Sequence, residues 1–125
     1  MASALHLTLW TTDIPGMTRF LERVAGLKVL GHHPGFAELM AGDSRVTLHS
    51  DEAYRGHPWF NAVSKEGVAR GIGAEIAFSV ANVESAFQVA AREGALQIAP
   101  PYEVDGHREC TVMGPDGYLF TLVEG

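Results

Sequence analysis

Few side chains in this chain of 125 residues have the types and spacing that chemistry requires. Cys110 is the only cysteine, and because no nucleophile motif surrounds it we expect a small buried side chain. No pair of cysteines or histidines has zinc-finger spacing, no serine lies in a nucleophile elbow, and Gly71-Ile72-Gly73 is too short for a phosphate loop. No catalytic motif therefore stands out from residue types and spacing alone.

An internal repeat organises the chain, with His6 and Glu75 at equivalent positions at its two starts. The segments 6–30 and 75–98 follow the same order, with a strand-like stretch, a helical stretch and a second strand-like stretch. Asp13 and Asn82 precede the helical stretches, and such side chains cap helix starts. A glycine follows each helical stretch, as a left-handed helix end requires. The repeat therefore predicts two similar modules.

Short strands separated by turn residues complete each module. We expect strands at about 27–32, 36–41, 45–50, 96–99, 107–113 and 118–124. The strand at 96–99 ends where Pro100-Pro101 removes two backbone donors. Two copies of β-α-β-β-β make an α+β fold in a single domain, residues 1–125. The predicted parts are module one at about 4–50, a connector at 51–73 and module two at about 74–125.

Alternation along the first strand of each module separates an apolar face from a mixed face. The apolar faces consist of Leu5, Leu7, Leu9, Ile76, Phe78 and Val80. The mixed faces consist of His6, Thr8, Trp10, Glu75, Ala77 and Ser79. We expect the apolar faces to pack on the helices and the mixed faces to line a cavity.

Composition excludes several classes of partner. The net charge is −6, with 9 basic and 15 acidic residues, so no basic cluster is available to neutralise a nucleic-acid backbone. No apolar run is long enough to span a membrane, and the N-terminus lacks the pattern of a signal peptide. One cysteine fits a reducing compartment, and we expect a cytoplasmic protein.

The stretch 114–124 carries a family resemblance. It reads Gly-Pro-Asp-Gly-Tyr-Leu-Phe-Thr-Leu-Val-Glu, and its first residues are typical of a tight turn in which Asp116 bonds to its own backbone. This ending resembles the Asp-Pro-Asp-Gly-Asn/Tyr-x-x-Glu-Leu close of the vicinal oxygen chelate family, which includes glyoxalase I, extradiol dioxygenases and bleomycin-resistance proteins. The resemblance covers about 4–50 and 73–124. It implies paired modules that form a concave half-barrel cleft, usually in a homodimer.

Metal-using members of this family direct four side chains at a divalent cation, typically two His or Gln and two Glu. The matching positions here are His6, Thr47, Glu75 and Thr121. Neutral hydroxyls at two of them are poor donors, so the pattern is most similar to metal-free, bleomycin-resistance-like members, and we expect no cofactor. A divalent metal remains an alternative, because His49 lies two residues from Thr47 and could supply a third ligand. The other histidines fit solvated loops or edges: His32, His33, His57 and His107.

The first functional hypothesis is a binding protein that sequesters a small hydrophobic or aromatic molecule without metal, as in antibiotic resistance or self-protection. An aromatic plate with neutral hydroxyls suits such a pocket. The aromatic connector 51–73 could cover it as a lid, or could instead cover the core or a subunit contact. The predicted ligand-binding residues are His6, Thr8, Trp10, Thr47, His49, Trp59, Phe60, Glu75, Ser79, Tyr102 and Thr121.

Two other functions stay open. One is an enzyme, either a metal-dependent lyase or dioxygenase, or a metal-free acid–base catalyst with Glu75 as base and His6 as its partner. The same two residues could instead form a structural hydrogen bond between the modules. The other is a structural or regulatory module whose cleft has lost its ligand.

Overall fold

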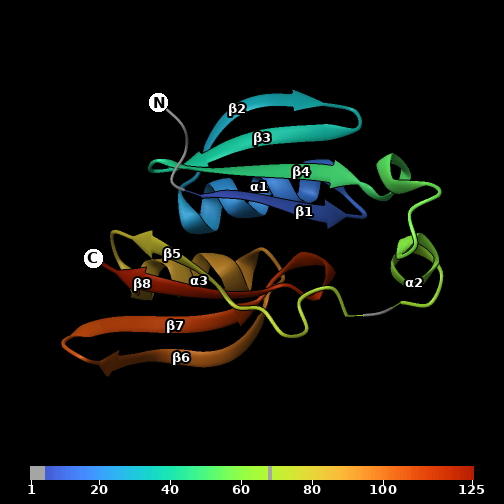
Figure 1. Cartoon of the computed structure of the whole chain (residues 1–125). Coiled ribbons are helices and arrows are strands. Elements are labelled where there is room, and N and C mark those ends of the chain that lie inside the picture. Colours follow the sequence, from blue (N-terminus) through green and yellow to red (C-terminus); the bar gives the residue numbers. More distant parts are fainter. Residues whose placement is uncertain (1–4, 68) are drawn as a thin grey trace.

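The computed structural model describes residues 5–67 and 69–125, and it confirms the α+β fold of two tandem modules (Figure 1). The first module consists of β1 (His6–Thr11), α1 (Ile14–Ala25), β2 (Lys28–His33), β3 (Phe36–Ala41) and β4 (Ser44–Ser50). The second consists of β5 (Ile76–Val80), α3 (Val83–Arg92), β6 (Leu96–Val104), β7 (His107–Met113) and β8 (Leu119–Glu124). The remaining helices are short: η1 (Asp51–Tyr54), α2 (Phe60–Ser64) and η2 (Pro115–Gly117). Residues 1–4 lie outside the described residues. The expectation that the N-terminus carries no signal peptide concerns this segment and stays a prediction.

Each module forms one four-stranded mixed sheet, and neither sheet closes into a barrel. The strand orders are β1-β4-β3-β2 and β5-β8-β7-β6, with the first and last strand of each module paired in parallel. The helices α1 and α3 lie behind the sheets and contact each other (Figure 1). The edges of β1 and β5 therefore face each other at the middle of the molecule. Within the described residues no helix is long and apolar enough to cross a membrane.

Both long helices begin where their caps were predicted. The Asp13 carboxylate accepts the N–H of Gly16 at 3.0 Å, and the Asn82 side chain accepts that of Ser85 at 2.9 Å. These bonds satisfy donors that have no partner inside the helix. Gly26 ends α1 with a φ of 72°, which a glycine adopts without strain.

The core lies between the helices and the apolar faces of the two sheets. Met17 and Leu21 of α1 and Val83 of α3 are fully buried. Phe120 of β8 joins the modules, because its ring lies 5.7 Å from that of Phe20 and 5.9 Å from that of Phe78. Packing of these apolar faces leaves the mixed faces of the strands to line the open side of the sheets.

Strand β6 differs from the prediction. It continues through Pro100-Pro101 to Val104 instead of ending near residue 99. It is the outer strand of its sheet, where a missing N–H leaves no ladder bond unmade. The pairing with β7 shifts register on both sides of Ala99, so the irregularity is confined to the proline segment.

Candidate functional site

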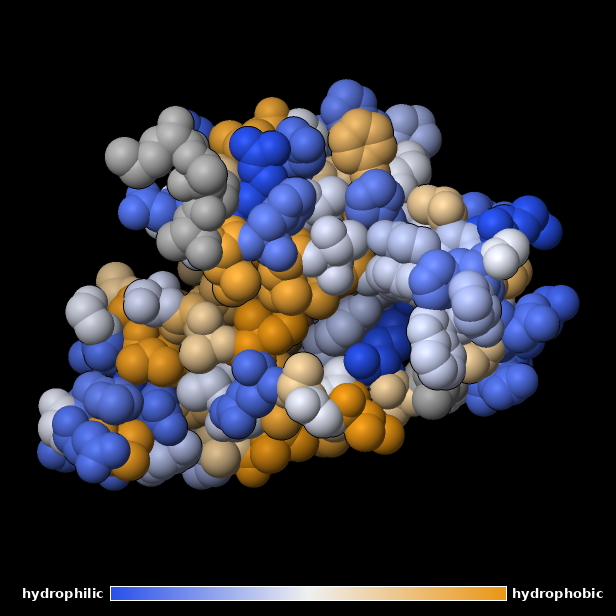
Figure 2. Space-filling model, in the orientation of Figure 1, coloured by the Kyte–Doolittle hydropathy of each residue, from blue (hydrophilic) through white to orange (hydrophobic). Residues whose placement is uncertain are grey.

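The largest cavity near the predicted site lies between β1 and the connector, and we name it the connector cavity. Its volume is about 670 Å³, within the range of sites that hold small molecules. Most of its lining is apolar: Leu7, Thr8, Leu9, Trp10, Trp59, Ala62, Val63, Ala69, Arg70, Gly71, Ile72, Ala74, Ile76, Tyr118 and Leu119. Apolar residues gather between the modules on this face, beside a hollow next to the connector (Figure 2).

Aromatic rings form one wall of the connector cavity. Trp10 is stacked on Tyr54 of η1, with centroids 3.6 Å apart and planes at 13°, and the edge of His57 lies 5.1 Å from Trp10. Burial raises the pKa of Tyr54 above its ordinary value. Trp59 also lines the cavity but is 65% exposed. Such rings offer flat apolar area to a planar molecule.

Arg70 is the only charged side chain among the described residues that line the connector cavity. Its guanidinium donates to both carboxylate oxygens of Asp51 at 2.6 and 2.8 Å, and to the carbonyl of Val63 at 3.3 Å. The hydrogen bond to Asp51 is the main cause that raises the pKa of Arg70. Sequence reasoning missed this residue, whose only signal is a lone arginine in an apolar stretch beside Gly71.

Asp116, in the turn before β8, connects the second module to the first through its side chain. Its carboxylate accepts the Thr11 hydroxyl at 2.6 Å, and the Thr12 hydroxyl and N–H at 2.8 and 3.2 Å. The guanidinium of Arg70 lies 3.9 Å away. We had expected Asp116 to bond to its own backbone, but its φ of 61° turns the chain while the side chain bonds to β1 and Thr12. These bonds hold connector, β1 and the final turn together.

A second cavity adjoins the first. Its volume is about 510 Å³, and it shares lining residues with the connector cavity: Ala69, Gly71, Ile72, Ala74 and Leu119. Besides two glycines, the residues that line only this adjoining cavity are Glu75 and Met113. Glu75 is the only charged residue among the described residues that line this adjoining cavity.

The four positions matched to metal ligands form two separate pairs. His6 Nε2 lies 2.8 Å from Thr47 Oγ1, and Thr121 donates its hydroxyl proton to Glu75. Although His6 and Glu75 are both described, no hydrogen bond or ion pair joins them. Between residues 5 and 125, leaving out 68, no three His, Cys, Asp or Glu side chains form a group that could hold a metal ion. This donor set does not fit the divalent site of metal-using proteins.

The other predicted ligand-binding residues lie in different places. Tyr102 donates to Glu109 at 2.6 Å on the open face of the second sheet, which is the main cause that raises the pKa of Tyr102. His49 lies edge-on to Tyr54, with centroids 5.8 Å apart. Phe60 lies under the Arg55 guanidinium and lines neither cavity. Only Thr8, Trp10 and Trp59 of the predicted set therefore line the connector cavity.

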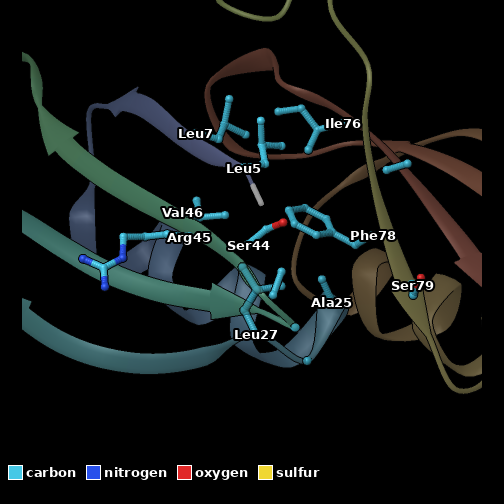
Figure 3. Close-up of a pocket in the computed structure, with 14 residues that line it drawn as sticks. Leu5, Leu7, Ala25, Leu27, Ser44, Arg45, Val46, Ile76, Phe78 and Ser79 are labelled. Atoms are coloured by element: carbon cyan, nitrogen blue, oxygen red, sulfur yellow. The ribbon is translucent and has the colours of Figure 1, made fainter. Parts of the chain in front are cut away.

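Ser79 lines a third, smaller cavity of about 370 Å³ between the modules. Leu5 and Leu7 from the first module face Ile76 and Phe78 of β5 across it, whereas the Arg45 side chain extends away (Figure 3). This cavity lies where the edges of β1 and β5 face each other. Its walls combine apolar side chains of both modules with polar residues such as Ser44 and Ser79, so it lies at the edge of the core.

Comparisons with known proteins agree with this geometry. The family model described as the Glyoxalase/Bleomycin resistance protein/Dioxygenase superfamily matches residues 3–122. A solved glyoxalase/bleomycin resistance protein/dioxygenase family enzyme from Burkholderia phytofirmans PsJN is 25% identical, with 95% of both chains covered and a TM-score of 0.78. The fosfomycin resistance protein FosX from Mesorhizobium loti is 20% identical, with 96% of this chain and 89% of that chain covered and a TM-score of 0.68. The likeness to FosX shows the fold alone. A search of proteins with curated functions gives no match.

Proposed function

Because the chain belongs to the glyoxalase/bleomycin resistance protein/dioxygenase superfamily, we propose that it binds a small hydrophobic or aromatic molecule in the connector cavity without a metal ion. The observation that carries this proposal is the cavity itself, about 670 Å³ with Trp10 and Trp59 in a mostly apolar wall. A planar molecule of this size would bury its faces against rings and aliphatic side chains.

The donor set supports binding rather than metal chemistry. Thr47 and Thr121 are 7% and 5% exposed, and their hydroxyls are hydrogen-bonded to His6 and Glu75 respectively. The separation of His6 from Glu75 also gives no support to a proton-transfer pair. The proposal includes a cytoplasmic location, which the lone buried Cys110 fits.

The names of the family and of FosX support a protective role. Both refer to resistance against an antibiotic. Binding alone protects if the protein holds the molecule away from its target, and this needs affinity but no turnover. We therefore propose sequestration as the mode of action.

A panel of aromatic antibiotics, titrated while tryptophan fluorescence is followed, tests the proposal. We expect at least one compound to quench the fluorescence and to bind in calorimetry. In the Trp59→Ala variant the affinity should fall about tenfold, as for a central aromatic contact. Stability should change by less than about 0.5 kcal/mol, because this side chain is exposed. The matched control is Phe36→Ala, which removes a half-exposed ring of β3 that lines none of the three cavities.

Two results would contradict the proposal. One is the absence of quenching by every compound of the panel. The other is elemental analysis of the purified protein that finds one Ni, Zn, Fe or Mn per chain, which would favour the lyase or dioxygenase alternative.

A further inference from the structure

Building on the proposed function, we infer that the connector cavity and the adjoining cavity select an aromatic molecule that carries a positive charge, and that Glu75 and Asp51 set this preference. The two cavities share five lining residues and therefore lie side by side. The charged groups among their described lining residues are Arg70 and Glu75. The selectivity therefore depends on how each of these charges is compensated.

Arg70 is not available to an anion. Its side chain is 7% exposed, and its two terminal nitrogens are held by Asp51 in a bidentate pair. Asp116 is a second carboxylate, 3.9 Å from the guanidinium. Two carboxylates around one guanidinium leave a net negative charge, so a carboxylate or phosphate in the cavity would be repelled.

The carboxyl group of Glu75 belongs to the lining of the adjoining cavity. Its hydrogen-bond donor is the hydroxyl of Thr121, a neutral group. Among the described residues no Lys, Arg or His side chain forms an ion pair with Glu75. An ammonium group in the adjoining cavity would give this carboxylate its counter-charge, while the aromatic body lies against Trp10.

Calorimetry with three probes that share one ring system tests the inference. The probes are naphthylmethylamine, naphthylmethanol and naphthoate, which at neutral pH are positive, neutral and negative. We expect the amine to bind about fivefold more tightly than the alcohol, the value for one exposed ion pair, and naphthoate to bind most weakly.

Two isosteric variants identify the residues. Glu75→Gln should abolish the preference for the amine and leave the affinity for the alcohol unchanged. Asp51→Asn should release the Arg70 guanidinium and strengthen naphthoate binding about tenfold, a gain that partial unfolding cannot produce. The matched control is Glu22→Gln, which removes one negative charge from the exposed face of α1.

The outcomes separate this inference from the proposed function. Binding of all three probes with equal affinity would overturn the charge preference and leave the binding function intact. An equal loss for all probes in Glu75→Gln would overturn the role of Glu75. Binding of none of them would contradict the proposed function and this inference with it.

Discussion

Thr47 and Thr121 illustrate how buried hydroxyls find hydrogen-bond partners at the positions matched to metal ligands. The Thr47 hydroxyl is hydrogen-bonded to His6, and the Thr121 hydroxyl donates to Glu75. Thr111 Oγ1 also lies 3.4 Å from Thr121 Oγ1. Within the described residues no buried side-chain nitrogen or oxygen lacks a partner. The hydroxyls thus hold His6 and Glu75 on their own sheets, which explains why these two residues stay apart.

Cys110 gives a prediction at the scale of one residue. Its thiol is 0% exposed, and burial raises its pKa to about 11. Relative to a thiol with the ordinary pKa of 9.0, the thiolate fraction at moderate pH falls about 100-fold. We expect the folded protein to resist a thiol reagent at neutral pH and to react with one equivalent after unfolding in urea.

The sign of the Cys110 effect also sets a pH window. Because folding raises the pKa of an acid, the buried thiol favours the folded state below the unfolded pKa, and this contribution is lost as the pH rises toward about 11. The Cys110→Ala variant supplies the background of the labelling assay. Rapid labelling of the folded protein would contradict the prediction.

Part of the site could be predicted from single residues and part could not. Alternation predicted that Thr8 and Trp10 line a cavity, because strand geometry is local. It did not predict that Leu7 and Leu9 of the opposite face also line the connector cavity, which they do because β1 is an edge strand. The role of Asp116 depends on Thr11, 105 residues away, and no local pattern encodes such a contact. Arg70 and its partner Asp51 were missed for the same reason.

At the scale of elements, the connector is held by charge as well as by packing. Arg70 joins η1 through Asp51 and approaches the final turn through Asp116. Tyr118, directly after this turn, donates to the Trp10 carbonyl at 2.7 Å. Gly71 makes the close approach possible, because a Cβ there would lie 2.6 Å from the Gly117 carbonyl oxygen.

Removing the charge of Asp116 should loosen this arrangement. Asp116→Asn keeps a residue that tolerates the φ of 61°, but it weakens the acceptor of three hydrogen bonds. We expect a loss of about 2 kcal/mol in the free energy of unfolding, measured by urea denaturation. Weaker binding in the connector cavity should accompany it.

The control for this prediction is Asp43→Asn, in the exposed turn between β3 and β4. The free energy of unfolding of the Asp43→Asn variant should equal that of the unsubstituted protein. Equal stability of the Asp116 variant and this control would show that the carboxylate does not hold the modules together.

At the scale of the whole molecule, the repeat made the fold predictable. Strand-helix order, caps and turn residues recur in both halves, so two modules followed from the sequence. The end of β6 was mispredicted because Pro100-Pro101 breaks a central strand but is tolerated in an outer one. The position of a strand within its sheet is set by tertiary structure, so the local preferences of its residues do not predict it.

We also propose that two chains form a homodimer. Apolar side chains stay exposed on the outer strand β6, with Leu96 at 60%, Ile98 at 46% and Tyr102 at 40%. Exposed outer strands of this kind invite pairing with another chain. Light scattering should give twice the chain mass of 13.5 kDa, and a single-chain mass at micromolar concentration would exclude the dimer.

The parallel pairing of β1 with β4 has a consequence for biosynthesis. The sheet of module one is complete once Ser50 has left the ribosome, because all its strands lie between His6 and Ser50. The nascent chain can therefore bury its first core before module two is translated, as expected for N-terminal units that fold first. The contact between Thr11 and Asp116 can form only after Asp116 has been translated, so the connector cavity is completed later than the sheet of module one.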